Sequence, residues 1–126
     1  MATVEIVSFG FLHDAPPAAD LLLDLRHHFR DPHISPELRH MTADDKPVRD
    51  AVLGTPGIQQ LVQATAAAVS AFAAGPSAGV IAVATGCAGG RHRAPTVARE
   101  VAARLVAAGH AVVVQHRDLC KPVVHR

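Results

Sequence analysis

The sequence predicts one α/β domain over residues 1–126, a three-layer sandwich with a mainly parallel sheet of about four strands. Short apolar runs rich in β-branched residues are separated by helix-like segments or long loops, which is the pattern of strands joined by crossovers. The 126-residue chain is 49% hydrophobic, with four Phe and no Tyr or Trp. We therefore expect one buried core made of Ala, Val and Leu.

The first half of the chain is predicted to contain two strands and two helices. The apolar runs 3–8 and 21–25 are predicted to be strands, the second one buried, joined by a loop in which adjacent prolines disfavour a helix. The polar stretch 27–47 is predicted to be irregular, because prolines interrupt it and it lacks a helical period. A short helix is expected from about Pro47, and an Ala-rich helix over about 58–74.

The second half is predicted to hold a strand, a glycine-rich turn, a helix and a last strand. The strand covers 80–85 (VIAVAT) and the turn covers 86–90 (GCAGG). Apolar residues then recur every four positions, which indicates one buried helix face. A final strand is expected over 111–114 (AVVV).

The turn after the central strand is predicted to bind phosphate. The first N–H groups of a helix have no intrahelical partner, and the helix dipole adds partial positive charge there. Gly86, Gly89 and Gly90 allow positive φ and close approach of a ligand. Ligands also collect at the carboxyl ends of parallel strands, where the sequence places Ser8, Gly10, Asp24, Arg26, Cys87, Ala88, Gly89, Gly90, His92, Arg93, His116 and Arg117.

Two pairs of these residues each have an alternative interpretation. Asp24 and Arg26 are close enough in sequence to form a local ion pair instead of contacting a ligand. Cys87 and Arg93 have the C-x5-R spacing of cysteine phosphatases, in which a thiolate favoured by the helix N-terminus attacks phosphorus. Gly86 and Ala94 depart from the residues that flank the C-x5-R motif in cysteine phosphatases. No catalytic residue is therefore assigned, and Cys87 is kept only as the nucleophile of this alternative function.

Composition disfavours several other classes of function. A net charge of +1 and the lack of Tyr and Trp give little support for base stacking on aromatic side chains. The histidines of 27–47 lack the spacing of a metal site, and no Lys follows the glycines as in a Walker loop. We expect no metal and no cofactor. Without a signal peptide or a membrane span, the expected location is the cytoplasm.

At this point several motifs resemble one known family. Gly86–Arg93 (GCAGGRHR) resembles the GCTGG-x-HRS motif of the RapZ C-terminal domain, found in the YvcJ-like RNase adapter proteins. Further matches follow in the same order as in that family: VSFGF at 7–11, the Asp-rich segment 19–26, the stretch 31–48 and HRDL at 116–119. The resemblance thus covers nearly the whole chain.

The resemblance implies a sensor that binds an amino sugar phosphate such as glucosamine-6-phosphate and reports it to an RNA or RNase partner. It adds His33 to the candidate ligand residues, with Asp24 and Arg26 reading hydroxyl or amino groups. The nucleotide-binding half of the family has no counterpart in these residues, so a separate nucleotide-binding protein is an expected partner. The apolar helices favour a homo-oligomer. Three functions stay open: a metabolite sensor or adapter, a cysteine-dependent phosphatase, and an RNA-binding module.

Overall fold

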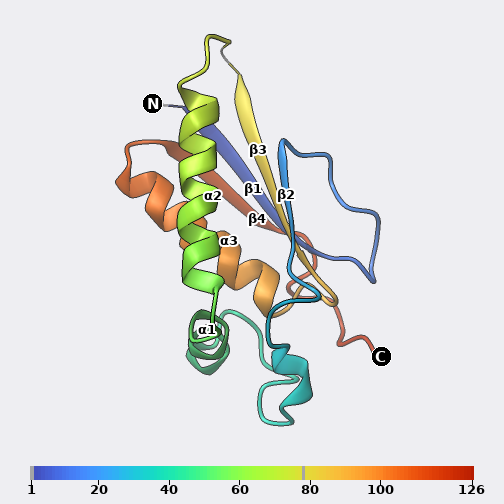
Figure 1. Ribbon diagram of the computed structural model, residues 1–126. Coiled ribbons are helices and arrows are strands. Elements are labelled where there is room, and N and C mark those ends of the chain that lie inside the picture. Colours follow the sequence, from blue (N-terminus) through green and yellow to red (C-terminus); the bar gives the residue numbers. More distant parts are fainter. Residues whose placement is uncertain (1, 78) are drawn as a thin grey trace.

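The computed structural model describes residues 2–77 and 79–126 and has a parallel sheet with helices (Figure 1). The four strands are all parallel and lie in the order β2-β3-β1-β4. The predicted α/β class with a four-stranded parallel sheet is confirmed. In chain order the elements are β1 (Thr3–Gly10), β2 (Leu21–Asp24), the 3-10 helix η1 (Pro32–Ile34), α1 (Lys46–Leu53), α2 (Ile58–Ala73), β3 (Val80–Cys87), α3 (Arg93–Ala107) and β4 (Ala111–His116).

The helices and the sheet share one core. Along β1, Val4 and Ile6 are fully buried in the core shared with the helices, whereas Thr3 and Glu5, which alternate with them, are exposed. Because side chains alternate between the faces of a strand, the helices pack on one face of the sheet. Over the carboxyl end of the other face lie the rings of Phe9 and the following loop, so the sheet there lies between helices and a loop layer.

Strand boundaries differ from the prediction at the ends that carry glycine. β1 and β3 both run two residues further than expected, because Phe9 pairs with Gly86 and Gly10 pairs with Cys87. The glycine-rich turn therefore begins at Ala88, and the prediction of a turn from Gly86 was wrong. The expected burial of the second strand was also wrong. β2 is an edge strand paired only with β3, and alternate residues along it are exposed.

Gly86 is required by packing. A Cβ built there would lie 2.4 Å from the Phe9 ring and 2.5 Å from the Phe11 ring. The two rings meet edge to face, with their centroids 4.7 Å apart. They thus cover the carboxyl end of β3 on the side opposite the helices.

The strand order determines where a ligand can bind. The loop that follows β1 leads toward β2 across the face that carries the Phe9 and Phe11 rings, whereas the loop that follows β3 leads into α3 on the opposite face and on to β4. The adjacent strands β1 and β3 thus send their connections to opposite faces, and such a point is where open parallel sheets form their binding crevice.

Candidate functional site

The loop between β3 and α3 packs tightly against the end of β1. A Cβ at Gly10 would lie 2.5 Å from the carbonyl carbon of Gly89. Gly90 has φ 77°, and a Cβ there would lie 2.7 Å from the amide nitrogen of Gly10. Gly86 and Gly89 do not have positive φ, so that part of the prediction was wrong for both. Gly90 is the residue at which the loop needs left-handed backbone.

This loop presents a run of free backbone donors. Within residues 2–77 and 79–126, the N–H groups of Gly89, Gly90, Arg91 and His92 have no hydrogen-bond acceptor. α3 begins at Arg93, and the side chain of His92 does not cap it. Consecutive N–H groups around a left-handed residue, next to a helix N-terminus, form a concave site for anions. The predicted anion-binding character of the loop therefore has a structural basis.

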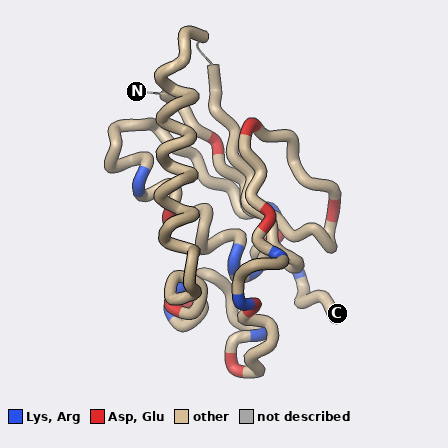
Figure 2. The backbone as a smooth tube through the Cα atoms, viewed as in Figure 1, with Lys and Arg blue, Asp and Glu red and all other residues tan. Residues whose placement is uncertain are grey.

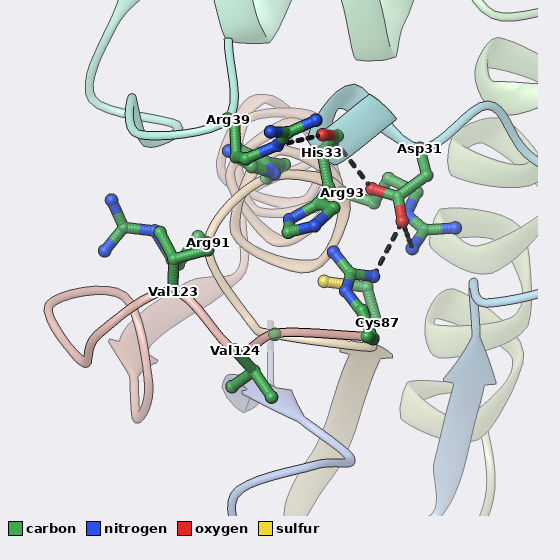
Figure 3. Close-up of a pocket in the computed structure, with 11 residues that line it drawn as sticks. Asp31, His33, Arg39, Cys87, Arg91, Arg93, Val123 and Val124 are labelled. Atoms are coloured by element: carbon green, nitrogen blue, oxygen red, sulfur yellow. Dashed lines mark hydrogen bonds and ion pairs between the residues drawn. The ribbon is translucent and has the colours of Figure 1, made fainter. Parts of the chain in front are cut away.

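A small pocket lies in front of these donors (Figure 3). Its enclosed volume is about 10 Å³, which is the space of a single water molecule. Three parts of the chain line it: the segment around η1 (Asp31, His33, Arg39), the β3–α3 loop with the start of α3 (Cys87, Gly89, Arg91, His92, Arg93), and the C-terminal residues Val123, Val124 and Arg126.

Arg93 holds one wall of the pocket in place. Only 2% of the residue is exposed. Its Nη1 donates to the carbonyl oxygens of Leu25, Arg26 and Phe29 at 2.9–3.2 Å, and its Nη2 lies 3.2 Å from the Asp31 carboxylate. The Nε–H group is buried without a partner among the described residues. Arg93 therefore fixes the loop after β2 and retains one free donor, which is costly unless a ligand or water accepts from it.

Arg91 has the same character on the opposite wall. Its Nη1 donates to the carbonyl of Lys121 at 2.8 Å, and its Nη2 donates to the carbonyl of His40 at 2.9 Å. Its Nε, like that of Arg93, is buried and has no partner within the part of the chain that the structure describes. Two arginines thus each contribute an unsatisfied donor to the site that the loop amides surround.

Cys87 is the last residue of β3, and its sulfur accepts a hydrogen bond from the amide of Ala94, in the first turn of α3, at 3.4 Å. The residue is 3% exposed. The terminal nitrogens of Arg93 bond the carbonyl groups of the loop after β2 and the Asp31 carboxylate. Its Nε–H is therefore the guanidinium donor left without a partner among the described residues.

The two histidines of the pocket favour their neutral forms. Burial lowers the pKa of His92, although the hydrogen bond between its Nε2 and the carbonyl of Met41, 2.8 Å long, opposes the shift. Because a carbonyl only accepts, Nε2 carries the proton in this contact. Burial, aided by the charge of Arg126, also lowers the pKa of His33. Neither ring supplies a fixed positive charge, so the guanidinium groups and amides carry the attraction for an anion.

Asp24 and Arg26 bind each other outside this pocket. Arg26 donates to both carboxylate oxygens, at 2.9 and 2.7 Å, and its guanidinium lies 3.7 Å above the Phe11 ring. The hydrogen bond from Arg26 lowers the pKa of Asp24 to about 2. The two side chains thus form the local ion pair that was predicted as the alternative to ligand contact.

The other predicted residues also lie outside the pocket lining. Ser8 and His116 pair across β1 and β4, with Oγ and Nδ1 2.6 Å apart. Arg117 donates to the carbonyls of Gly10 and Ala15 and binds the buried Asp118 carboxylate. These three side chains secure the ends of the strands. Gly10 packs directly against the backbone of Gly89 and Gly90, and the carbonyl of Ala88 accepts a hydrogen bond from the amide of Leu12.

Several pocket residues were absent from the predicted set. Asp31 and Arg39 both lie in the stretch 27–47, which was predicted to be irregular. Arg91 was adjacent to the predicted loop residues and could have been included from that position alone. The C-terminal residues Val123, Val124 and Arg126 had no sequence signal that linked them to the loop.

Across residues 2–77 and 79–126, no cluster of three or more His, Cys, Asp or Glu could hold a metal ion. No helix in those ranges combines the length and the apolar character needed to cross a bilayer.

The fold and site define a class of protein: a parallel α/β domain with an anion-binding loop after its central strand. Comparison with known proteins is more specific, since the family model described as RapZ C-terminal domain matches residues 2–120. The chain belongs to this family, as the sequence motifs predicted. The β3–α3 loop and all the strands and helices lie within the matched stretch.

Curated relatives agree with this assignment. The chain is 38% identical over 118 residues to a nucleotide-binding protein of Thermobifida fusca, covering 91% of this chain and 40% of the relative. It is 40% identical over 119 residues to one of Salinispora tropica, with 92% and 39% covered. For one of Rubrobacter xylanophilus the values are 40% over 124 residues, with 93% and 40% covered. The chain thus spans about 40% of the length of these relatives.

Proposed function

We propose that the protein binds the phosphate group of a small metabolite at the β3–α3 loop. One observation carries the proposal: the consecutive amides from Gly89 to His92 are free, and Arg91 and Arg93, which line the pocket, each have a buried Nε–H group without a partner among the described residues. A dianionic phosphate would accept hydrogen bonds from these groups, and charge-assisted bonds of this kind are the strong ones. Membership in the RapZ C-terminal domain family supports the proposal.

The ligand we propose is an amino sugar phosphate such as glucosamine-6-phosphate. Next to the cationic groups the pocket holds one carboxylate, that of Asp31. A carboxylate beside a phosphate site disfavours a simple anion and favours a ligand that also carries an ammonium group. His33, which lines the same wall, is placed to bond a sugar hydroxyl.

The proposed role is that of a sensor or adapter. The ligand-bound domain would report to another macromolecule, with an RNA or an RNase as the proposed partner. The curated relatives are named nucleotide-binding proteins, and about 60% of their length lies outside the match. A separate nucleotide-binding protein is therefore a second proposed partner. The free Cys87 and Cys120 accord with the cytoplasm as its compartment.

A homo-oligomer is also proposed, and the open sheet face supports it. Leu22, Val80 and Val113 are 44%, 52% and 61% exposed. They come from three strands of one sheet. Exposed apolar side chains gathered on one sheet are a common feature of subunit contacts.

Calorimetry with a matched pair of variants tests the ligand assignment. Neither Gly89 nor Gly79 has any atom within 4 Å of an added Cβ, so Gly89→Ala and Gly79→Ala should both fold normally. Gly89 lies in the pocket, whereas Gly79 precedes the opposite end of β3. We expect glucosamine-6-phosphate to bind wild type and Gly79→Ala equally and to bind Gly89→Ala at least tenfold more weakly. Glucosamine without phosphate should not bind measurably.

Two outcomes would contradict the proposal. If no phosphorylated sugar, nucleotide or inorganic phosphate binds at millimolar concentration, the loop has only a structural role. If binding is equal in all three proteins, the ligand occupies another site. Release of phosphate from an aryl phosphate, lost in Cys87→Ser, would instead support the phosphatase alternative.

A further inference from the structure

The last residues of the chain cover the candidate site. We define residues 121–126 as the C-terminal strap. Val123, Val124 and Arg126 of the strap line the pocket together with the β3–α3 loop (Figure 3). The stretch that matches the RapZ C-terminal domain stops at residue 120, so the strap lies outside the part of the chain that the family model describes.

The strap is fixed firmly at its start. The carbonyl of Lys121 accepts from Arg91 at 2.8 Å, and the amide of Lys121 donates to the carbonyl of Asp118. The Lys121 ammonium also lies 2.6 Å from the fully buried Asp118 carboxylate. Any movement of the strap therefore begins after Lys121.

Beyond Lys121 the strap is held weakly. In the described ranges, the backbone N–H groups of residues 123–126 have no acceptor, and Pro122 has no N–H group. One charged contact remains, in which Nη1 of Arg126 lies 2.7 Å from the Asp31 carboxylate. The two side chains of this pair are 24% and 19% exposed. A segment without backbone hydrogen bonds, held by one partly exposed ion pair, opens at low cost.

The closed strap and a bound ligand exclude each other. With the strap in place the enclosed pocket is about 10 Å³, which is far below the 300 Å³ or more of ordinary small-molecule sites. A second hollow adjoins the strap, lined by Val123, His125 and Arg126 of the strap and by Ile34 and His40. The strap therefore has room to move away from the loop.

We propose that the strap is an autoinhibitory latch that the ligand displaces. The inference rests on the proposed function. A phosphate occupies the loop donors, while an ammonium group of the same ligand replaces the Arg126 guanidinium at Asp31. Releasing the strap converts ligand binding into a change at the molecular surface, where a partner can detect it.

The latch predicts that removing the positive charge of Arg126 tightens binding of an anionic ligand. Arg126→Gln removes a positive charge beside a phosphate site, and by simple attraction it should weaken binding of an anion. Under the latch, the same change removes the competitor and tightens binding of glucosamine-6-phosphate, by about two- to fivefold for a partly exposed ion pair. Arg30→Gln removes an equal charge from an exposed side chain with no ion pair in the described structure and should not tighten it.

Calorimetry and heteronuclear NOE measurements on the full 15N-labelled chain test the latch. In the unliganded protein, the NOE of Val124 should be high in wild type and Arg30→Gln and low in Arg126→Gln. Saturating wild type with glucosamine-6-phosphate should lower it to the level of Arg126→Gln. Binding by Arg126→Gln that is unchanged or weaker overturns the latch.

The two levels of the proposal fail in different ways. If glucosamine-6-phosphate binds wild type but leaves the Val124 NOE high, the proposed function stands and the latch falls. If no phosphorylated compound binds either protein, the proposed function fails. The Val124 NOE of the unliganded proteins then still decides whether Arg126 holds the strap closed. Equal Val124 NOE values in wild type and Arg126→Gln would overturn the latch.

Discussion

Asp118 should make this domain acid-sensitive. Its carboxylate is fully buried and accepts from the Gly10 amide at 2.7 Å and from Arg117 at 2.9–3.0 Å. Burial alone raises the pKa of Asp118, but these bonds, together with that from Lys121, outweigh it and lower the pKa from 3.8 to about 2. Because the folded-state pKa is below the unfolded one, the carboxylate stabilises the fold above pH 3.8, and this stabilisation is lost as the pH falls through 2.

The size of the effect follows from the shift. At about 1.4 kcal/mol per pKa unit, a fall from 3.8 to about 2 corresponds to about 2 kcal/mol at pH 7. About half of this remains at pH 3, where the folded protein still ionises the group and the unfolded chain has mostly protonated it. Asp118→Asn should therefore lower the free energy of unfolding by about 2 kcal/mol at pH 7 and by about 1 kcal/mol at pH 3.

Urea denaturation of both proteins at pH 7, 5 and 3 measures this difference. The difference in free energy of unfolding between the two proteins should be the same at pH 7 and pH 5, because both pH values lie above the pKa of this carboxyl group in the unfolded chain. If Asp118→Asn is as stable as wild type at pH 7, or if the loss is the same at pH 3, then Asp118 does not hold the ends of β1 and β4 as described.

Three further changes test the packing around the site by urea denaturation. Gly86→Ala, which places a methyl group against two phenylalanine rings, should cost about 1–3 kcal/mol, whereas Gly79→Ala should be nearly neutral; equal stability would contradict the ring cover. Arg93→Met leaves three carbonyls and a carboxylate with fewer donors and should cost about 3–5 kcal/mol; a cost below 1 kcal/mol would show that Arg93 does not fix the pocket wall. Lys46→Ala removes an ion pair with Asp50 whose side chains are 76% and 59% exposed, and should change stability by no more than about 0.5 kcal/mol.

The β3–α3 loop could be predicted because its chemistry is local. A strand, a glycine-rich segment and a helix follow one another in GCAGGRHR and its flanks, so the free amides and the helix N-terminus follow from the order of residues. The end of β3 could not be placed from sequence in the same way. Gly86 indicated a turn, but the rings of Phe9 and Phe11 occupy the space where a side chain would lie, and the residue continues the strand.

The rest of the pocket depends on contacts between distant segments. Arg93 was predicted as a phosphate ligand, yet most of its donors bond carbonyls of the loop after β2, which has no period that would place it there. The charges of Asp24 and Arg26 are satisfied by each other, an outcome that sequence spacing allowed without selecting it. Arg126 reaches Asp31 across 95 residues of sequence, and a short tail with little charge gives no sign of such a contact.

The central claim, that the loop amides bind phosphate, is tested most directly by an amide NMR titration. Lys and Arg also lie on α1 and toward the C-terminal end of α3, away from the β3–α3 loop (Figure 2), so adventitious binding of phosphate to surface cations would shift amides in those segments. With glucosamine-6-phosphate, we predict saturable shifts that are largest at Gly89, Gly90, Arg91 and His92. Largest shifts elsewhere, or shifts that rise linearly without saturation, would contradict the account.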